Sequence, residues 1–213
     1  MQNVMHIRVI QNRLLAYFIF FGLSCIACTS NAKTIMILGD SISAGYGMKP
    51  TQTWVHLLEK RLEQHYPKQH KVVNASVSGE TTAGALARLP KLLQTHKPAV
   101  VVIELGGNDG LRGQPPQSIQ KNLENLVKQS QNTKAQVILV GMKIPPNYGQ
   151  AYTKAFENNY KVVSQKYKVK LLPFFLVGVA GNKNLMQSDL IHPNVKAQPI
   201  LLNTIYPYIK GAL

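Results

Sequence analysis

"AVVVIELG", residues Ala99 to Gly106, is a short and mostly apolar run that is rich in valine and ends at a glycine. This pattern is typical of a strand buried on both faces of a sheet. Four other runs share it, and stretches whose apolar residues recur at helical spacing separate the runs. The other strands are expected at 34–39, 71–76, 136–142 and 169–174, and the helices at 53–66, 82–96, 117–131 and 151–167. A last helix is expected from about Pro193 to Ile209, bent by Pro199 and Pro207.

The alternation of strand and helix predicts an α/β fold with a doubly wound, five-stranded parallel sheet. In such folds ligands bind beyond the carboxyl ends of the strands, where the strand order reverses. Ser41 follows the first strand, Gly79 the second and Asn108 the third. If the strand order is 2-1-3-4-5, these three turns are neighbours with Ser41 in the middle. The segment "SDLIHPN" (188–194) follows the last strand and can return to the same edge.

The residues at this edge match the needs of acyl transfer: a nucleophile, a base, an acid that orients the base, and donors for an oxyanion. Ser41 offers the hydroxyl, His192 the base and Asp189 the orienting acid. The backbone amides of Ser41 and Gly79 and the side-chain amide of Asn108 are candidate oxyanion donors. Each residue also has an ordinary reading, since serine caps helices and glycine and asparagine favour turns. Their joint occurrence at matching strand ends favours the catalytic reading.

Four blocks of the sequence resemble the GDSL (SGNH) esterase family: "GDSISAG" (39–45), "NASVSGETTAG" (74–84), "LGGNDGLRG" (105–113) and "DLIHPN" (189–194). The resemblance covers nearly all of residues 34–200. It is greatest to bacterial periplasmic members with thioesterase, lysophospholipase and arylesterase activity.

The resemblance implies a three-layer α/β/α, flavodoxin-like fold, no cofactor and export by a signal peptide. Ser41, Gly79, Asn108 and His192 match the four residues after which the family is named, and Asp189 matches its triad acid. Fatty acyl esters and thioesters are then the expected substrates. Their acyl chain is expected to lie over the loops 110–116 and 144–149.

The first 32 residues differ in composition from the rest. Arg8 and Arg13 precede an apolar run of fifteen residues, 14–28, which is too short to cross a membrane. This pattern, with small residues before Lys33, predicts a signal peptide cleaved after Ala32 and a single domain at 33–213. The alternative is an uncleaved membrane anchor.

Both cysteines, Cys25 and Cys28, lie within this segment. Lipoprotein processing at either one is disfavoured because neither has a leucine three residues before it. Residues 33–213 contain no cysteine, which excludes disulfides, cysteine-ligated zinc and a cysteine nucleophile from that part of the chain. A periplasmic or secreted location is expected.

The chain carries a formal net charge of +15. Residues 1–32 hold two arginines and no acid, so the remainder carries +13. An anionic surface such as phospholipid headgroups is a candidate partner. Nucleic acid is not expected, because the lysines are scattered and no recognisable nucleic-acid module accompanies them. A monomer is expected.

Other catalytic classes lack their motifs. The run "GGNDGLRG" (106–113) does not end in Gly-Lys-Ser/Thr, and no G-x-G-x-x-G follows the first strand. Ser43 stands where the nucleophile elbow of α/β-hydrolases needs a second glycine. No H-E-x-x-H occurs, and no metal site is expected. Two alternatives stay open: a carbohydrate O-acetylesterase on the same fold, and a non-catalytic lipid- or glycan-binding protein.

Overall fold

The computed structural model describes residues 32–213, so the expected signal peptide of residues 1–32 falls almost wholly outside the described chain. The described chain contains a parallel sheet in the order β2-β1-β3-β4-β5, as the sequence predicts. Its strands are β1 (Lys33–Gly39), β2 (His70–Asn74), β3 (Val100–Glu104), β4 (Gln136–Val140) and β5 (Lys170–Leu172).

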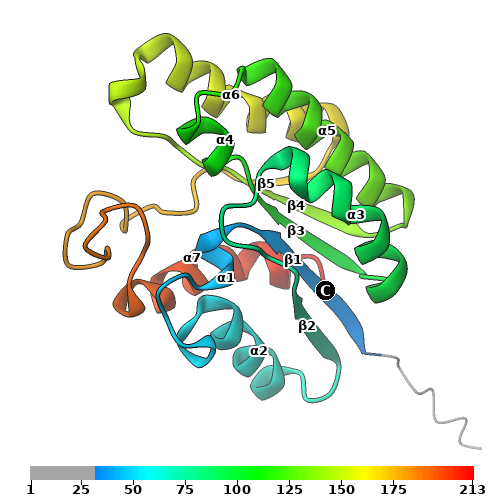
Figure 1. Ribbon diagram of the computed structural model, residues 1–213. Helices are drawn as coiled ribbons and strands as arrows, with labels where there is room; N and C mark the ends of the chain where they lie inside the picture. The colour runs from blue at the N-terminus through cyan, green and yellow to red at the C-terminus, as the bar shows by residue number, and fades with distance from the viewer. Residues whose placement is uncertain (1–31) are drawn as a thin grey trace, which may run out of the picture. The chain divides into compact units, whose positions relative to one another are not determined.

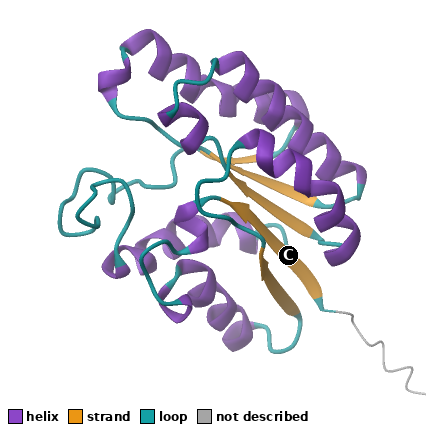
Figure 2. Cartoon of the chain, in the orientation of Figure 1, coloured by secondary structure: helices purple, strands orange, loops and turns teal. Residues whose placement is uncertain are grey.

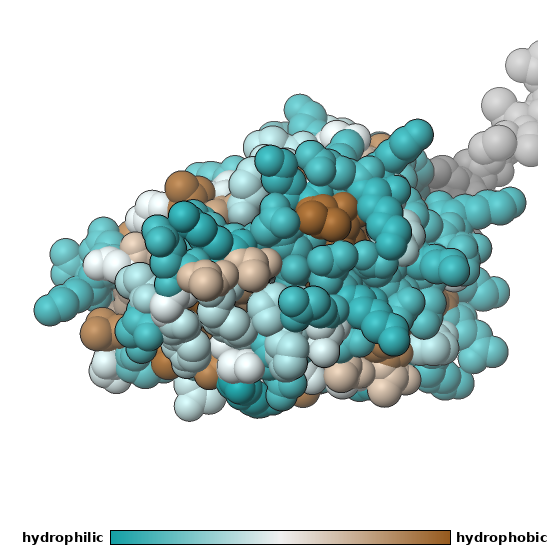
Figure 3. Space-filling view, turned by 90° about the horizontal axis from the view of Figure 1, so that it is seen from above, coloured by the Kyte–Doolittle hydropathy of each residue, from teal (hydrophilic) through white to brown (hydrophobic). Residues whose placement is uncertain are grey.

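Helices cover both faces of this sheet (Figure 1). On one face α2 (Trp54–His65) packs against α7 (Gln198–Lys210). On the other, α5 (Pro116–Asn132) packs against both α3 (Thr82–His96) and α6 (Gln150–Tyr167). The three-layer α/β/α architecture is therefore confirmed. The face over α5 and α6, seen from above in Figure 3, is largely hydrophilic, with brown atoms in small separate groups.

The burial of the strands follows from these two layers. All five residues of β3 are 0% exposed, which explains why its sequence shows no polar alternation. Helix α2 buries Val55, Leu58 and Leu62, which recur at helical spacing, and Thr53 caps it by accepting from the His56 amide. No helix of residues 32–213 has both the length and the apolar character needed to span a membrane.

The predicted start of the last helix is wrong. Pro193 lies before the helix in a bridge with Met186, and Asn194 caps a single 3-10 turn, Val195–Ala197, before α7 begins. Pro199 lies in the first turn of α7, where proline fits without bending the helix. Two further short helices, α1 (Ser41–Ala44) and α4 (Gly107–Leu111), occupy turns in which no helix is expected from the sequence.

Candidate active site

The carboxyl ends of β1, β2 and β3 bring together the three predicted turns. Ser41 is the first residue of α1, Gly79 lies in the loop after β2, and Asn108 lies in α4 after β3. The long segment between β5 and α7 extends beyond the same end of the sheet (Figure 2). It carries Asp189 and His192, so all five predicted site residues lie at one edge.

Hydrogen bonds connect three of them in series. Nε2 of His192 is 2.9 Å from Oγ of Ser41, and Nδ1 of His192 is 2.6 Å from Oδ2 of Asp189. The other carboxylate oxygen of Asp189 accepts from the amides of Ile191 and His192, at 2.9 and 3.0 Å. Desolvation raises the pKa of Asp189, but the hydrogen bonds from His192 and Ile191 outweigh it and lower the pKa to about 2. Asp189 is therefore ionised at neutral pH and favours a proton on Nδ1 of His192.

The loop that holds His192 is fixed at several points. The His192 carbonyl accepts from the Gln187 amide, and the side chain of Gln187 donates to the carbonyl of Tyr46. The rings of Tyr46 and His192 lie 4.5 Å apart, between centroids, and are tilted by 38°. At the two ends of the segment, Phe175 packs edge-on against Trp54, whose amide donates to the side chain of Gln198. These contacts restrict the imidazole to the region of Ser41.

Ser41 is not the cap of α1. The side chain of Asp40 takes that role by accepting from the Ile42 amide at 3.0 Å. The hydroxyl of Ser41 is thus left to bond with His192, which removes the main structural reading of this serine.

The candidate oxyanion donors face the same edge. Within residues 32–213, neither the Ser41 nor the Gly79 amide donates a hydrogen bond to another protein group. Gly79 has a φ of +79°, a left-handed conformation that glycine adopts readily. The side-chain amide of Asn108 donates to Oδ2 of Asp40 at 3.2 Å and to the carbonyl of Glu80 at 3.0 Å. An oxyanion therefore has to share one of these two protons with Asp40 or with the Glu80 carbonyl.

Two buried acids, Asp40 and Glu104, lie close to Ser41 in the fold. Burial raises the pKa of Asp40 to about 6, while the Ile42 amide and the charge of His192 oppose the rise. Glu104, at the end of β3, is 0% exposed, and Oγ of Ser43 donates to it at 2.6 Å. Burial and then the charge of Asp40 raise the pKa of Glu104 well above its usual range. Burial therefore favours the neutral form of Glu104.

Glu104 and Ser43 were missed by the sequence interpretation, although a signal was present. Glu104 is the one charged residue in the apolar run 99–106. A carboxyl group within a strand buried on both faces needs a partner, and its place at the end of β3, two residues before Gly106, puts it at the functional edge. Asp109 has a structural role instead, because it accepts from the amide and hydroxyl of Thr82 at 2.9 and 2.6 Å.

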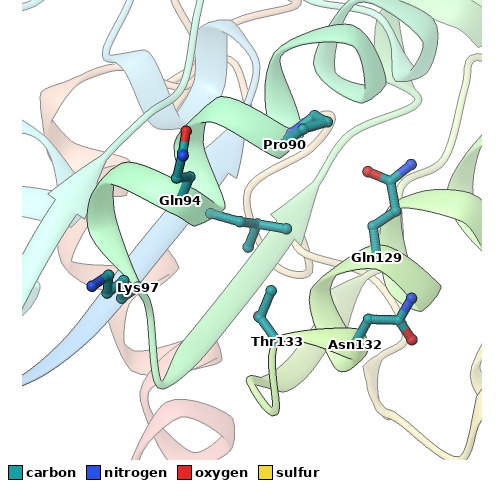
Figure 4. A pocket seen from close by; sticks show the side chains of 7 residues that line it. Pro90, Gln94, Lys97, Gln129, Asn132 and Thr133 are labelled. Carbon is teal, nitrogen blue, oxygen red and sulfur yellow. The ribbon is translucent and has the colours of Figure 1, made fainter.

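No metal site accompanies these residues. In the part of the chain that the structure describes, no three histidine, cysteine, aspartate or glutamate side chains gather as metal ligands would. A shallow groove of about 560 Å³ lies far from Ser41 and His192, between the C-terminal ends of α3 and α5 (Figure 4). Leu93, Lys97 and Gln129 are among its lining residues, and it holds none of the predicted site residues.

Comparison with known sequences agrees with this geometry. A family model described as the GDSL-like lipase/acylhydrolase family matches residues 37–198. The chain is 50% identical to esterase TesA of Pseudomonas aeruginosa over 183 residues, which cover 85% of this chain and 90% of that protein. It is 42% identical to an arylesterase of Vibrio mimicus, covering 88% of this chain and 92% of that one. Thioesterase 1 of Escherichia coli, also named protease 1 and lysophospholipase, is 43% identical, with 80% of each chain covered.

Solved structures show the same relationship. A crystal structure of TesA superposes with a TM-score of 0.82 at 50% identity and covers 85% of this chain and 100% of that one. Esterase EstA from Pseudoalteromonas sp., in a structure inhibited by monoethylphosphonate, gives a TM-score of 0.80 at 45% identity, with 84% and 97% covered.

Proposed function

This chain belongs to the GDSL-like lipase/acylhydrolase family and is a serine esterase, and on that premise we propose that Ser41 is its nucleophile. His192 is then the general base and Asp189 the acid that orients it. The observation that carries this proposal is the continuous series of hydrogen bonds, 2.9 Å from Ser41 to His192 and 2.6 Å from His192 to Asp189. The chemistry these residues perform is nucleophilic catalysis through an acyl-enzyme.

In the first half of the reaction, Nε2 of His192 takes the proton of Ser41 Oγ as that oxygen attacks the acyl carbonyl. The amides of Ser41, Gly79 and Asn108 donate to the oxyanion that forms. His192 then returns the proton to the departing alcohol or thiol, and the acyl group stays on Ser41. In the second half a water molecule repeats the sequence and releases the fatty acid, which restores the hydroxyl of Ser41. Asp189 stays ionised throughout and stabilises the charged imidazolium.

The proposed substrates are fatty acyl esters and thioesters, including lysophospholipids. The names of the arylesterase and thioesterase relatives support this range, and so does the net positive charge of the described chain. The acyl chain is proposed to lie over the loops 110–116 and 144–149. Tyr148 donates to the carbonyl of Leu111 at 2.7 Å and Tyr152 to that of Gln114 at 2.6 Å, which holds these two parts of the chain together.

A series of esters with acyl chains of increasing length tests both parts of the proposal. We expect medium-chain esters to be hydrolysed, and Ser41→Ala or His192→Ala to lose most turnover because members of a catalytic unit fail together. A serine-directed phosphonate should label Ser41. Ser118→Ala, which changes an exposed serine of α5, is the matched control. Unchanged hydrolysis by Ser41→Ala would reject the mechanism, whereas activity confined to acetylated sugars would favour the carbohydrate O-acetylesterase.

We propose further that residues 1–32 direct export to the periplasm or the medium and are removed near Lys33. The two arginines followed by an apolar run and small residues support this assignment. The mature chain then contains no cysteine, and we propose that it is a monomer. The intact mass of the exported protein tests the assignment, because a mass that retains Cys25 and Cys28 contradicts it.

A further inference from the structure

The two residues between the triad acid and base, Leu190 and Ile191, expose their apolar side chains. Leu190 is 58% exposed and Ile191 is 50% exposed. We call this pair the apolar tip. Nothing in the Ser41–His192–Asp189 chemistry uses these side chains, because only the Ile191 amide bonds with Asp189.

The other exposed large apolar side chains gather at the same end of the molecule. The ring of Tyr46 lies against His192, Val77 is two residues before Gly79, and Tyr148 bonds to the last residue of α4. The remaining two, Val177 and Val195, belong to the segment that joins β5 to α7 or to the turn at its end. Single exposed apolar residues are normal on any surface, but a group gathered around one site marks an interaction surface.

The backbone of Leu190 strengthens this conclusion. Its φ is +58°, in the left-handed region where the Cβ of a leucine approaches the following carbonyl oxygen. Glycine or asparagine suits this position better. Because the side chain is exposed, it gains nothing from the core that would offset this strain. The packing of the core therefore does not require a leucine at this position.

The charges around the tip indicate what the contact is. Lys183 and Lys196 are exposed on either side of it along the chain, and Lys49 follows the Tyr46 turn that bonds to Gln187. Within residues 32–213, none of these three lysines forms an ion pair. Of the acids at this end, Glu80 forms an ion pair with Arg88, and Asp189 bonds with the imidazole of His192, so the three lysines outnumber the acids. An apolar tip flanked by free cations matches the surface of an anionic phospholipid bilayer or micelle.

We propose that the enzyme docks on anionic lipid aggregates through this end, with Leu190 and Ile191 inserted among the acyl chains and the lysines against the phosphates. A lipid substrate then reaches Ser41 directly from the aggregate. The proposal rests on the lipid substrates proposed above. A second copy of the chain is a poorer occupant, because pairing two such faces brings like charges together.

Vesicle binding by the Ser41→Ala variant, which leaves the lipid intact, tests the docking. We expect it to bind phosphatidylglycerol vesicles more tightly than phosphatidylcholine vesicles, and less tightly as salt is added. Adding Leu190→Gly and Ile191→Ser should lower the affinity about tenfold or more, since both insertions are lost. Leu190→Gly alone should not lower the melting temperature, because it relieves the left-handed strain. An unchanged melting temperature would show that a loss of vesicle binding does not result from misfolding.

Two pairs of charge reversals distinguish binding through the lysines near the apolar tip from attraction by the net charge of the whole protein. Lys183→Glu with Lys196→Glu should weaken binding strongly. Lys97→Glu with Lys134→Glu changes the net charge equally, but at the C-terminal ends of α3 and α5, and should weaken it much less. Equal effects of the two pairs, or unchanged binding by the tip variant, would overturn the proposal.

Hydrolysis of a monomeric, water-soluble ester separates docking from the chemistry. The wild type and the tip variant should hydrolyse a soluble butyrate ester at rates within about twofold of each other.

If the wild type hydrolyses this ester but Ser41→Ala binds neither kind of vesicle, docking is wrong and the esterase assignment stands. A loss confined to monomeric esters of longer chains places the tip in an acyl subsite and overturns docking. A dimer that Leu190→Gly dissociates overturns it in favour of a second copy.

Discussion

Asn108 is the residue at which a catalytic and a structural role differ most clearly in their consequences. Its amide already donates to Asp40, the residue before Ser41, and to the carbonyl of Glu80, so it positions α4 beside the first turn of α1. We expect Asn108→Ala to lower kcat about a hundred- to a thousandfold, or about 3–4 kcal/mol, as for other lost oxyanion donors. KM should change little, because the bond strengthens only as charge develops. Asn108→Asp should be at least as damaging, since a carboxylate would face both Asp40 and the oxyanion.

The measurements are kcat, KM and the melting temperature of both Asn108 variants. A near-normal kcat with a lowered melting temperature would assign Asn108 to its turn alone. Slow labelling of Ser41 by a phosphonate should persist in both variants, because the nucleophile and its base are unchanged.

The carboxyl group of Asp40 is expected to lower stability as it ionises but to support activity. Its pKa is raised from 3.8 to about 6, so the folded state holds this proton more tightly than the unfolded state does. Stability from this group is present below pH 3.8 and is lost as the pH rises through about 6, a difference on the order of 3 kcal/mol. Asp40→Asn should remove that loss. It should also lower kcat. The two carboxylate oxygens of Asp40 accept from the Ile42 amide and from Asn108, whereas a side-chain amide has one oxygen, so the bond from Asn108 is lost.

Urea unfolding at pH 4 and pH 8 checks the prediction for Asp40. The stability of Asp40→Asn relative to wild type should be higher at pH 8 than at pH 4. Asp189 contributes in the opposite sense, since its pKa of about 2 gives stability above pH 3.8 that is lost as the pH falls further. Because both proteins contain Asp189, its contribution largely cancels in the difference between Asp40→Asn and wild type. An equal difference at both pH values would show that the Asp40 charge carries no such cost.

The residues at the site could be predicted from the sequence to different degrees. The proximity of Ser41, Gly79 and Asn108 follows from the strand order, because a parallel sheet brings the carboxyl ends of neighbouring strands to one edge. Asp189 and His192 lie in the segment after β5, which the strand order only allows to return to this edge, and the resemblance to the GDSL (SGNH) family identified them. The role of Asp40 as a cap and the pairing of Ser43 with Glu104 depend on side-chain directions across the sheet. Hydrophobic periodicity carries no information on these directions.

At the scale of elements, α4 and α3 are joined through Asp109. Its carboxylate, 3% exposed, accepts from the amide and hydroxyl of Thr82 at the start of α3. Asp109→Ala leaves a helix-end amide and a buried hydroxyl short of an acceptor, which should cost about 3 kcal/mol. Asp109→Asn keeps one acceptor oxygen and should cost less. Urea unfolding of both variants tests the link, and a cost for alanine below that for asparagine would contradict it.

Element boundaries were predicted well where burial determines them and poorly where loops do. Helices α2, α3, α5 and α6 begin within a residue of their predicted positions, because their apolar stripes and Thr53 and Thr81 caps are local. The predicted last helix begins about five residues before α7 does. The sequence favours Pro193 as a first helical residue, but its bridge to Met186 holds it in the loop that also carries His192.

At the scale of the whole molecule, the position of signal-peptide cleavage is limited by folding, because the cut must leave β1 intact. The proposed cleavage after Ala32 leaves β1 complete from Lys33. This strand is internal, since it pairs with β2 on one side and β3 on the other. Three consecutive residues of it, Ile35, Met36 and Ile37, are 0% exposed. A later cut would therefore open the centre of the sheet.

We expect a chain that begins at Lys33 to fold, and to unfold in urea identically with and without reductant, because it holds no cysteine. A chain that begins at Leu38 should fail to fold. Losing three fully buried side chains removes about 5–9 kcal/mol of transfer free energy, which is comparable to the whole stability of a typical domain. The loss of the strand's hydrogen bonds adds to that cost. Circular dichroism and soluble-ester hydrolysis of the two chains decide the matter: a folded, active chain starting at Leu38 would mean that β1 is dispensable, and it would remove this structural limit on processing.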